Sequence, residues 1–488
     1  MLLSSRLRTR TPRTAALLAA GASVALLAAA APQPAPLGIG DRLFPHLGNP
    51  GYDVQSYDIA FAYRGDNSKP LDAVTKIDAR TTSPLDRINL DFSHGTVRSV
   101  EVNGTPARFA TSDEDLIVTP AQPVPAGLPL HITVRHTSDP RPGKQEIGWV
   151  RTKDGLAMAN QADAAHRVFP CNDHPADKAY FTFRVTAPKN LTAVANGRPV
   201  ATARVGNTTS WVYRTRHPMA TELAQVSIGR SAVLHQEGPH GLPVRDVVPA
   251  KDVKALRPWL KKTPAQIAWM EGKVGRYPFE NYGLLIAEAS TGFELETQTL
   301  SLFERDLFTR PEYPKWYVDS IMVHELAHQW FGDSVSPRTW SDLWLNEGHA
   351  TWYEALYAQE KADQPMEKRM RAAYQNSDTW RAAGGPPAAP KGPESGEKIS
   401  IFRPVVYDGS ALVLYALRQE IGKNAFESLE REWVQTHRDD TATTADFTDL
   451  ASKVAGRDLS GFFHAWLYGA KTPPMPGHPD WKTQPARK

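Results

Sequence analysis

The sequence predicts a two-domain α+β protein: an N-terminal antiparallel β domain, folded as a sandwich or saddle, followed by a mainly helical domain. Its 488 residues are too many for one ordinary domain. Apolar and polar residues alternate in short runs over 52–228, which is typical of half-buried strands, whereas beyond Pro249 the apolar residues recur at helical spacing in longer segments. We therefore expect a β domain over 32–245 and a second domain over 246–472.

The β half carries both strand and turn signals. The run from Leu130 to Val134 alternates apolar and polar side chains, as expected when one face of a sheet is buried. Asn103-Gly104 and Asn196-Gly197 each follow a strand-like run, and such dipeptides favour a two-residue hairpin turn. The sequence therefore predicts two hairpins within an antiparallel sheet.

The second half consists mainly of segments long enough to form helices. Their apolar residues recur every three to four positions. These segments are 253–272, 317–332, 346–360 and 410–421. The chain ending, 473–488, is rich in proline and polar residues, and we expect it to be a disordered tail.

The first residues of the chain have the composition of a secretory signal peptide. A basic region with four arginines, from Arg6 to Arg13, precedes an apolar, alanine-rich stretch over 15–31. A retained membrane anchor is the alternative, but about 17 apolar residues fall short of the ~20 that span a bilayer. We expect segment 1–31 to be cleaved, and the mature protein to be secreted and free of the membrane.

The charge balance gives no reason to expect a nucleic-acid partner, and the cysteine content excludes a disulfide within the chain. Without the four arginines of the predicted signal, 52 of the 56 basic residues remain. They nearly balance the 53 acidic residues, so the mature chain is nearly neutral. This balance gives no reason to expect nucleic acid as a partner. Cys171 is the single cysteine, so no disulfide can form within the chain, and we expect its side chain to be buried.

The sharpest pattern is His324-Glu325-Leu326-Ala327-His328, inside a segment with helical spacing. Residues four apart lie on one face of a helix, so both imidazoles can bind the same zinc ion. Glu325 would lie beside the metal, where a carboxylate can take a proton from zinc-activated water and pass it to a leaving amine. Taken alone, the pattern also fits a helix with two surface histidines.

A third ligand is predicted from the segment Trp340 to Gly348. Glu347 follows His328 after eighteen residues and begins an amphipathic run, so a second helix can supply a carboxylate. Two histidines and one glutamate leave the fourth zinc position to water, which is the arrangement of a catalytic site. Asp342 and Glu354 are candidates to orient the imidazoles, with helix capping or a solvated charge as the alternative.

HELAHQWFGDSV together with WSDLWLNEG, at this separation, resembles the aminopeptidase N family of gluzincin zinc metallopeptidases, which also includes leukotriene A4 hydrolase. The stretch from Phe169 to Ala179 resembles a motif of that family's β domain, and 456–459 with 466–469 resembles its ending. The resemblance implies a thermolysin-like catalytic domain over 246–472 and one Zn²⁺ per chain. It also implies a short form without the large C-terminal helical domain of many members.

The resemblance also implies residues that bind the free N-terminus of a peptide. The family carries G-x-M-E-N where this chain has Glu296, which keeps the amine-binding glutamate, while Phe293, Leu295 and Thr297 depart from the pattern. Gln161 stands where the family has a Glu or Gln that helps to bind the amine. Without the resemblance, Glu296 is an ordinary strand carboxylate and Gln161 an exposed loop amide.

Tyr407 resembles the tyrosine of the family's Y-x-x-G-x-x-x-L segment, with Gly409 one place early and Ser410 where glycine is usual. The resemblance implies that this phenol donates a hydrogen bond to the oxyanion of the tetrahedral intermediate. Tyr353 and Tyr415 are alternatives, although each falls within an apolar helical pattern typical of a core residue.

The sequence therefore predicts a secreted zinc aminopeptidase that hydrolyses the N-terminal bond of peptides by zinc-activated water. Three alternatives stay open: an endopeptidase of thermolysin type, an epoxide hydrolase on the same zinc site, and a catalytically inactive secreted binding protein. His349 stands where the family usually has Phe. Because residues two apart on a helix point away from each other, we expect it to be packed or capping rather than a further ligand beside Glu347.

Overall fold

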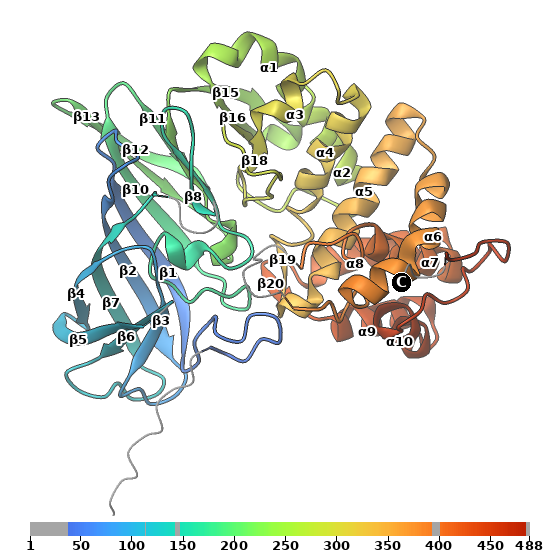
Figure 1. Ribbon diagram of the computed structural model, residues 1–488, viewed down its shortest axis with the longest axis horizontal. Helices are drawn as coiled ribbons and strands as arrows, with labels where there is room; N and C mark the ends of the chain where they lie inside the picture. Colours follow the sequence, from blue (N-terminus) through green and yellow to red (C-terminus); the bar gives the residue numbers. More distant parts are fainter. Residues whose placement is uncertain (1–37, 113, 142–146, 393–400, 485–488) are drawn as a thin grey trace, which may run out of the picture. The chain divides into compact units, whose positions relative to one another are not determined.

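The computed structural model describes residues 38–112, 114–141, 147–392 and 401–484, and Figure 1 shows its elements along the chain. The predicted signal peptide 1–31 lies outside the described residues. The strands of the first half are β1 (Tyr52–Ala62), β2 (Leu71–Thr81), β3 (Ile88–Asp91), β4 (Val97–Val102), β5 (Thr105–Ser112), β6 (Asp115–Thr119), β7 (Pro129–Ser138), β8 (Gly148–Arg151), β9 (Leu156–Ala159), β10 (Tyr180–Pro188), β11 (Thr192–Ala195), β12 (Arg198–Val205), β13 (Thr208–Arg214), β14 (Val226–Gly229), β15 (Ser231–Glu237) and β16 (Pro243–Pro249).

Two sheets share one hydrophobic core in the β domain. The larger sheet has ten strands in the order β12-β13-β10-β1-β2-β7-β4-β5-β6-β3, and the smaller has four in the order β11-β14-β9-β8. β1 and β10 pair in parallel, whereas β1 with β2 and β2 with β7 are antiparallel, as are the smaller sheet's pairs. Phe61 of the larger sheet packs on Trp149 of the smaller one, with ring centroids 5.3 Å apart. The predicted β sandwich is confirmed.

The two predicted hairpins have different outcomes. Asn103 and Gly104 form the two-residue turn between β4 and β5, and both have positive φ, 50° and 76°. The prediction of a hairpin at Asn196-Gly197 is wrong, because β11 pairs within the smaller sheet and β12 within the larger one. The chain crosses between sheets there, and the buried Asn196 amide donates to the carbonyl oxygen of Gln298 at 2.6 Å. This bond ties the β domain to the second half.

A third sheet joins the two halves of the chain. Its order is β15-β16-β17-β18, where β17 spans Leu284–Ala287 and β18 spans Ser301–Glu304. The predicted domain boundary after residue 245 falls inside β16. The two halves are therefore connected through a shared sheet rather than by a linker.

The second half is mainly helical, as predicted. Figure 1 shows its helices in colours from yellow-green to red. They are α1 (Val253–Leu260), α2 (Thr263–Val274), α3 (Arg305–Thr309), α4 (Lys315–Ala327), α5 (Trp344–Ala362), α6 (Met366–Gly384), α7 (Asp408–Ile421), α8 (Lys423–Thr436), α9 (Thr444–Ala455) and α10 (Ser460–Tyr468), with the short strands β19 (Val335–Pro337) and β20 (Asp440–Ala442).

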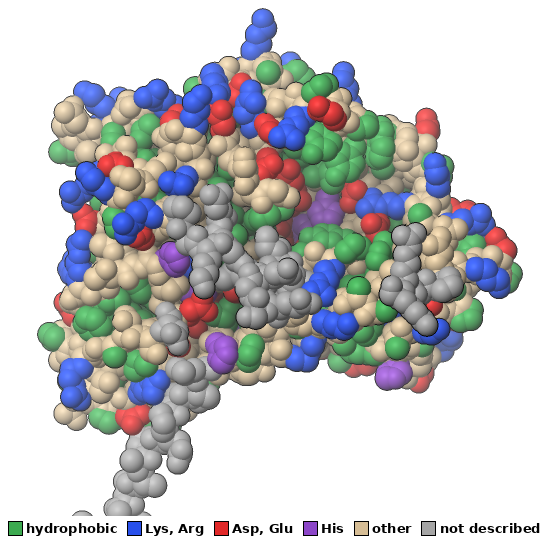
Figure 2. All heavy atoms as spheres, in the orientation of Figure 1, with side chains coloured by type: hydrophobic (Ala, Val, Ile, Leu, Met, Phe, Trp, Pro, Cys, Tyr) green, Lys and Arg blue, Asp and Glu red, His purple; other side chains and the backbone are tan. Residues whose placement is uncertain are grey.

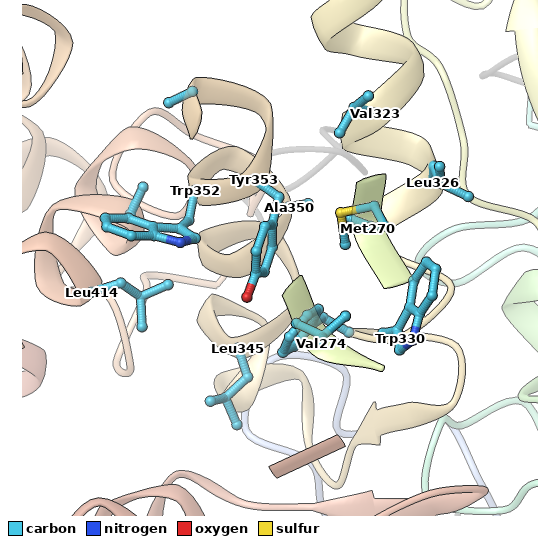
Figure 3. Close-up of a cluster of buried hydrophobic side chains, with 14 of the residues drawn as sticks. Met270, Val274, Val323, Leu326, Trp330, Leu345, Ala350, Trp352, Tyr353 and Leu414 are labelled. Carbon is cyan, nitrogen blue, oxygen red and sulfur yellow. The ribbon is translucent and has the colours of Figure 1, made fainter. Parts of the chain in front are cut away.

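A buried cluster fixes α4 against α5, the two helices with the predicted metal ligands. Figure 3 shows Val323 and Leu326 of α4, Met270 of α2 and Tyr353 of α5 within this cluster. Burying each side chain of this size contributes roughly 1.5–3 kcal/mol. The core therefore holds the C-terminal end of α4 close to the N-terminal end of α5.

The prediction of a disordered tail over 473–488 differs from the structure over 473–484. Met475 and Trp481 are each only 4% exposed, and both belong to the core of the helical half. Trp481 stacks on Tyr415 of α7 with ring centroids 5.8 Å apart. The segment has no apolar periodicity, so composition alone suggested disorder, but two isolated apolar side chains bind it to the helices.

Cys171 is fully buried in the core of the β domain, as predicted. Burial raises the pKa of its thiol well above the ordinary value, so the thiol stays protonated. Within the described part of the chain, none of the helices has the length and apolar character that crossing a membrane requires.

Candidate functional site

The three predicted zinc ligands lie together where α4 ends and α5 begins. His324 lies in the last turn of α4, His328 directly follows that helix, and Glu347 lies in the first turn of α5. Glu347 Oε2 is 3.4 Å from Nε2 of each histidine. One ligand atom from each residue lies within 4.8 Å of the other two, and all three side chains are buried.

The chemistry of this group fits a zinc ion. Imidazole nitrogen and carboxylate oxygen are ligands that zinc prefers, and three protein ligands leave one position open. Glu347 Oε2 is buried and receives no hydrogen bond from the described residues. Burial raises the pKa of Glu347, but His328 and His324 outweigh it and lower the pKa to about 2. The site therefore holds a buried negative oxygen that a cation would satisfy.

Each imidazole is held through its second ring nitrogen. His324 Nδ1 lies 3.2 Å from Glu354 Oε2, and His328 Nδ1 lies 3.0 Å from the carbonyl oxygen of Phe331. When Nδ1 carries the proton and donates it to these acceptors, Nε2 of both rings is free to bind a metal. Glu354 is thus in place to orient His324, as the sequence suggested.

Two other residues that the sequence singled out have structural contacts: Asp342 shows the capping alternative, and His349 is packed as expected. Asp342 accepts hydrogen bonds from the backbone nitrogen and the hydroxyl of Thr444 at 2.9 and 2.7 Å, so it fixes the start of α9 and not an imidazole. His349 Nδ1 lies 2.6 Å from the carbonyl oxygen of Leu345, and Nε2 lies 3.2 Å from Glu430. Both ring nitrogens of this buried histidine are therefore used within the core.

Glu325 lies beside the predicted ligands in the same cleft. Its Oε2 atom is buried and accepts no hydrogen bond from the described residues. Burial raises the pKa of Glu325 to about 8, although His324 and His328 act in the opposite direction. A cation bound nearby would lower this pKa again. A carboxylate in this setting can take up and return a proton.

Tyr407 faces the predicted metal ligands from the start of α7. Its ring centroid is 6.1 Å from that of His324. The approach of α7 to α5 requires a glycine at position 348, because a Cβ on Gly348 would lie 2.7 Å from the Cβ of Ser410. Burial and then the Glu347 carboxylate raise the pKa of Tyr407 well above its ordinary value. The phenol therefore keeps its proton and can donate a hydrogen bond.

Glu296 and Gln161 meet where the two halves of the chain come together. Gln161 Nε2 donates to Glu296 Oε1 at 2.6 Å. Ligand atoms of Glu296, Glu325 and His328 lie within 4.8 Å of one another. Gln329, next to the predicted ligand His328, donates to the carbonyl oxygen of Glu296 at 2.9 Å. The predicted amine anchor is thus held directly beside the predicted metal site.

These groups line one open cleft of 920 Å³. Figure 2 shows histidine side chains in a hollow, with acidic side chains beside them and a hydrophobic surface above. The residues that line the cleft include Gln161, Phe293, Glu294, Glu296, Glu304, Arg310, Tyr313, Tyr317, His324, Glu325, His328, Glu347, Glu354, Arg369, Arg403, Tyr407 and Asp408. All seven predicted site residues are therefore on one cleft.

Two residues that support the site, Arg369 and Gln329, were not predicted from the sequence. Arg369 of α6 donates to both carboxylate oxygens of Glu354, at 2.7 and 3.2 Å, and to Asp408 at 2.7 Å. Gln329 could have been found, since it directly follows the second histidine of the motif. No sequence pattern marks Arg369, because it reaches the site from a third helix.

Each half of the chain matches the model of a known protein family. Residues 260–466 match the model described as Peptidase family M1 domain, and residues 55–223 match the one described as Peptidase M1 N-terminal domain. The first match contains the three predicted metal ligands with Glu325, and the second contains Gln161. The two matches follow each other in the order that the fold shows.

Similar proteins agree with these matches. Aminopeptidase 2 of Candida albicans is 26% identical over 67% of this chain and 36% of its own length. Tricorn protease-interacting factor F2 of Thermoplasma acidophilum is 25% identical over 88% of this chain and 54% of its own length. The chain thus spans about half the length, or less, of these two curated relatives.

Solved structures match the described fold along nearly their whole length. An M1 zinc metallopeptidase from Deinococcus radiodurans has a TM-score of 0.76 and 26% identity, over 90% of this chain and 98% of that one. A mutant of such a peptidase from Deinococcus radiodurans, bound to a Tyr-Ser-Ala substrate, also has a TM-score of 0.76 and 26% identity, over 91% and 100% of the two chains. Together with both family matches, these likenesses show that the chain belongs to the M1 family of zinc metallopeptidases.

Proposed function

We propose that this protein is an aminopeptidase that removes single residues from peptides with a free N-terminus. The observation that carries this proposal is the position of Glu296, whose carboxylate has ligand atoms within 4.8 Å of those of Glu325 and His328. An ammonium group bound by a buried carboxylate forms charge-assisted hydrogen bonds. With the amine held so close to the metal site, the bond that reaches the site is the first peptide bond.

The chain's own residues supply the proton transfer and the charge stabilisation. A bound zinc ion would polarise the scissile carbonyl and lower the pKa of a water molecule. Glu325 takes a proton from the water as its oxygen attacks the carbonyl carbon, and returns that proton to the leaving nitrogen as the C–N bond breaks. Tyr407 donates a hydrogen bond to the carbonyl oxygen as negative charge develops on it.

Acetylated peptides test the proposal most simply. A peptide and its N-acetyl form should be compared at equal concentration, with products identified by mass spectrometry. We expect stepwise loss of N-terminal residues from the free peptide and no cleavage of the acetylated one, since acetylation removes the charge that Glu296 binds. Internal cleavage of both peptides would instead identify an endopeptidase.

Replacing Glu296 by glutamine is expected to lower kcat/KM for an aminoacyl-arylamide by about 10- to 100-fold, the worth of one charge-assisted hydrogen bond. The loss should appear mainly in KM, because the bond is made before the reaction begins. Glu294→Gln is the matched control, since Glu294 lines the same cleft two positions away and its Oε2 accepts from the backbone nitrogen of Glu304. A larger loss in Glu294→Gln than in Glu296→Gln would assign the amine to Glu294.

Replacing Tyr407 by phenylalanine is expected to lower kcat by about 10²- to 10³-fold with little change in KM, the effect of removing one oxyanion donor. Steady-state kinetics on an aminoacyl-arylamide measures both constants. Tyr415→Phe is the control, because its hydroxyl lies 3.1 Å from Nε2 of His478, among the residues that bind the tail. Equal losses in both variants would show that the phenol at 407 has no special role.

We further propose that the protein is exported and that segment 1–31 is removed on the way. The support is the composition of this segment, four arginines before an apolar stretch. Intact-mass measurement of the protein purified from its native host tests the proposal. A protein retained in the cell with Met1 at its N-terminus would contradict it.

A further inference from the structure

One guanidinium group joins the two sides of the catalytic cleft. Arg369 Nη1 and Nη2 donate to the two oxygens of Glu354, and Nε donates to Asp408 Oδ1 at 2.7 Å. Glu354 faces Nδ1 of the metal ligand His324, and Asp408 directly follows Tyr407. A single side chain on α6 thus connects α5 with the start of α7.

Glu354, one of the two carboxylates that Arg369 contacts, is buried and only 6% exposed. Arg369 Nη1 and Nη2 reach its two oxygens at 2.7 and 3.2 Å. The planar guanidinium binds both oxygens of this carboxylate, so it fixes the direction of the group as well as its charge. Loss of Arg369 would leave Glu354 free to turn away from His324.

The contact between Arg369 and Asp408 lies at the start of α7. Asp408 is the first residue of that helix, and Tyr407 before it has a non-helical backbone, with φ −86° and ψ −93°. The direction of the phenol therefore depends on where and how α7 begins. An aspartate at the first position of a helix is favourable there, and Arg369 holds that aspartate at a fixed place beside α5.

We propose that Arg369 is a positioning residue that couples the orientation of the metal ligand His324 to that of the oxyanion donor Tyr407. The inference rests on the proposed function, because it assigns both groups to one reaction. We assign the guanidinium no contact with the reacting atoms. It keeps the ligand and the phenol in a fixed relation, and misplacement of a catalytic group by about 1 Å can cost roughly 100-fold in rate.

Kinetics and zinc release, measured in parallel, test the contact of Arg369 with Glu354 and its contact with Asp408. Arg369→Gln is expected to lower kcat by about 10- to 100-fold. It should also raise the rate of zinc release by about 10-fold, as does loss of other residues that hydrogen-bond to metal ligands. A chromophoric chelator measures this rate. Asp408→Asn should lower kcat without changing zinc release, and Glu354→Gln should speed zinc release. Arg371→Gln is the matched control on the same helix, because Arg371 pairs with Asp480 at 2.6 Å, and it should change neither quantity.

A double-mutant cycle separates positioning from general loss of stability. If Arg369 acts through the phenol, the loss of kcat caused by Arg369→Gln should be clearly smaller in a Tyr407→Phe background than in the native protein. Arg369→Lys should restore only part of kcat, since an ammonium cannot bind both carboxylates in the geometry of the planar fork. Thermal unfolding of each variant shows whether the changes follow stability.

Several outcomes would overturn the proposal. Raised KM with unchanged kcat in Arg369→Gln would make Arg369 a substrate-binding group, which its place in the cleft lining also allows. Full additivity with Tyr407→Phe would separate it from the phenol. If Arg369→Gln does not fold, Asp408→Asn decides, and native kcat in that variant overturns the coupling. Absence of aminopeptidase activity in the native protein would refute the proposed function alone, because zinc release still reports on the His324 arm.

Discussion

Replacing Glu325 by glutamine is expected to lower kcat by about 10²- to 10⁴-fold, the usual contribution of a general acid–base group. The amide keeps the size of the side chain but cannot take a proton from water or return one to the leaving nitrogen. The reason for so large an effect lies in the setting of the carboxylate. Its Oε2 is buried without a hydrogen-bond partner among the described residues, so this oxygen is free to accept a proton from water.

The same variant should keep the other properties of the site. Zinc content should stay at one ion per chain, since Glu325 is not a predicted ligand, and KM should change little because Glu296 still binds the amine. Metal analysis and steady-state kinetics measure both. A Glu325→Gln protein that has lost its zinc would make the carboxylate a ligand, and one with native kcat would remove it from the reaction.

Replacing Glu347 by alanine is expected to abolish both zinc binding at stoichiometric metal and measurable hydrolysis. The substitution leaves two imidazoles, and the buried negative charge that favours a cation is removed. Glu360→Ala is the matched control on the same helix, because Glu360 pairs with Lys273 at 2.7 Å near the surface. Dialysis against a chelator should reproduce the loss in the native protein, and added Zn²⁺ should restore activity there but not in Glu347→Ala.

Retention of zinc and activity by Glu347→Ala would require another third ligand. Glu296 is the group to examine in that case, since a carboxylate oxygen of Glu296 lies within 4.8 Å of a ring nitrogen of His328 and of a carboxylate oxygen of Glu325. Such a result would also remove the amine anchor on which exopeptidase action depends. The double substitution of Glu296 and Glu347 would then be needed to release the metal.

Local rules predicted the parts of the site that helices fix. His324 and His328 are four residues apart, so helical geometry alone places them on one face, and Glu347 follows at the start of the next helix. The turn at Asn103-Gly104 was equally local, because two residues with positive φ suit this dipeptide. Features set by neighbouring residues in the chain are therefore the ones that the sequence predicts well.

Features set by distant contacts were not predictable in this way. Asn196 has the same local signal as Asn103, but its side chain binds Gln298 from the other half of the chain. Trp481 lies in a proline-rich segment, and its burial depends on α7. Their roles depend on tertiary packing, which no periodicity or turn signal in a single sequence reports.

The roles of Glu296 and Gln161 came from family resemblance, since neither residue type nor spacing distinguished them. The structure brings both side chains together at 2.6 Å beside His328. Arg369 had neither a local pattern nor a family motif behind it. Its position became evident only when three helices were placed around one guanidinium.

X-ray absorption spectroscopy of the zinc-loaded protein, combined with metal analysis, tests the central claim that His324, His328 and Glu347 hold one catalytic ion. We expect one zinc per chain, with two imidazole nitrogens and carboxylate or water oxygens as ligands at about 2.0–2.2 Å. Glu347→Ala should remove this signal, and Glu360→Ala should leave it unchanged. A zinc ion bound by one imidazole or none, or a native zinc spectrum in Glu347→Ala, would rule out this set of ligands.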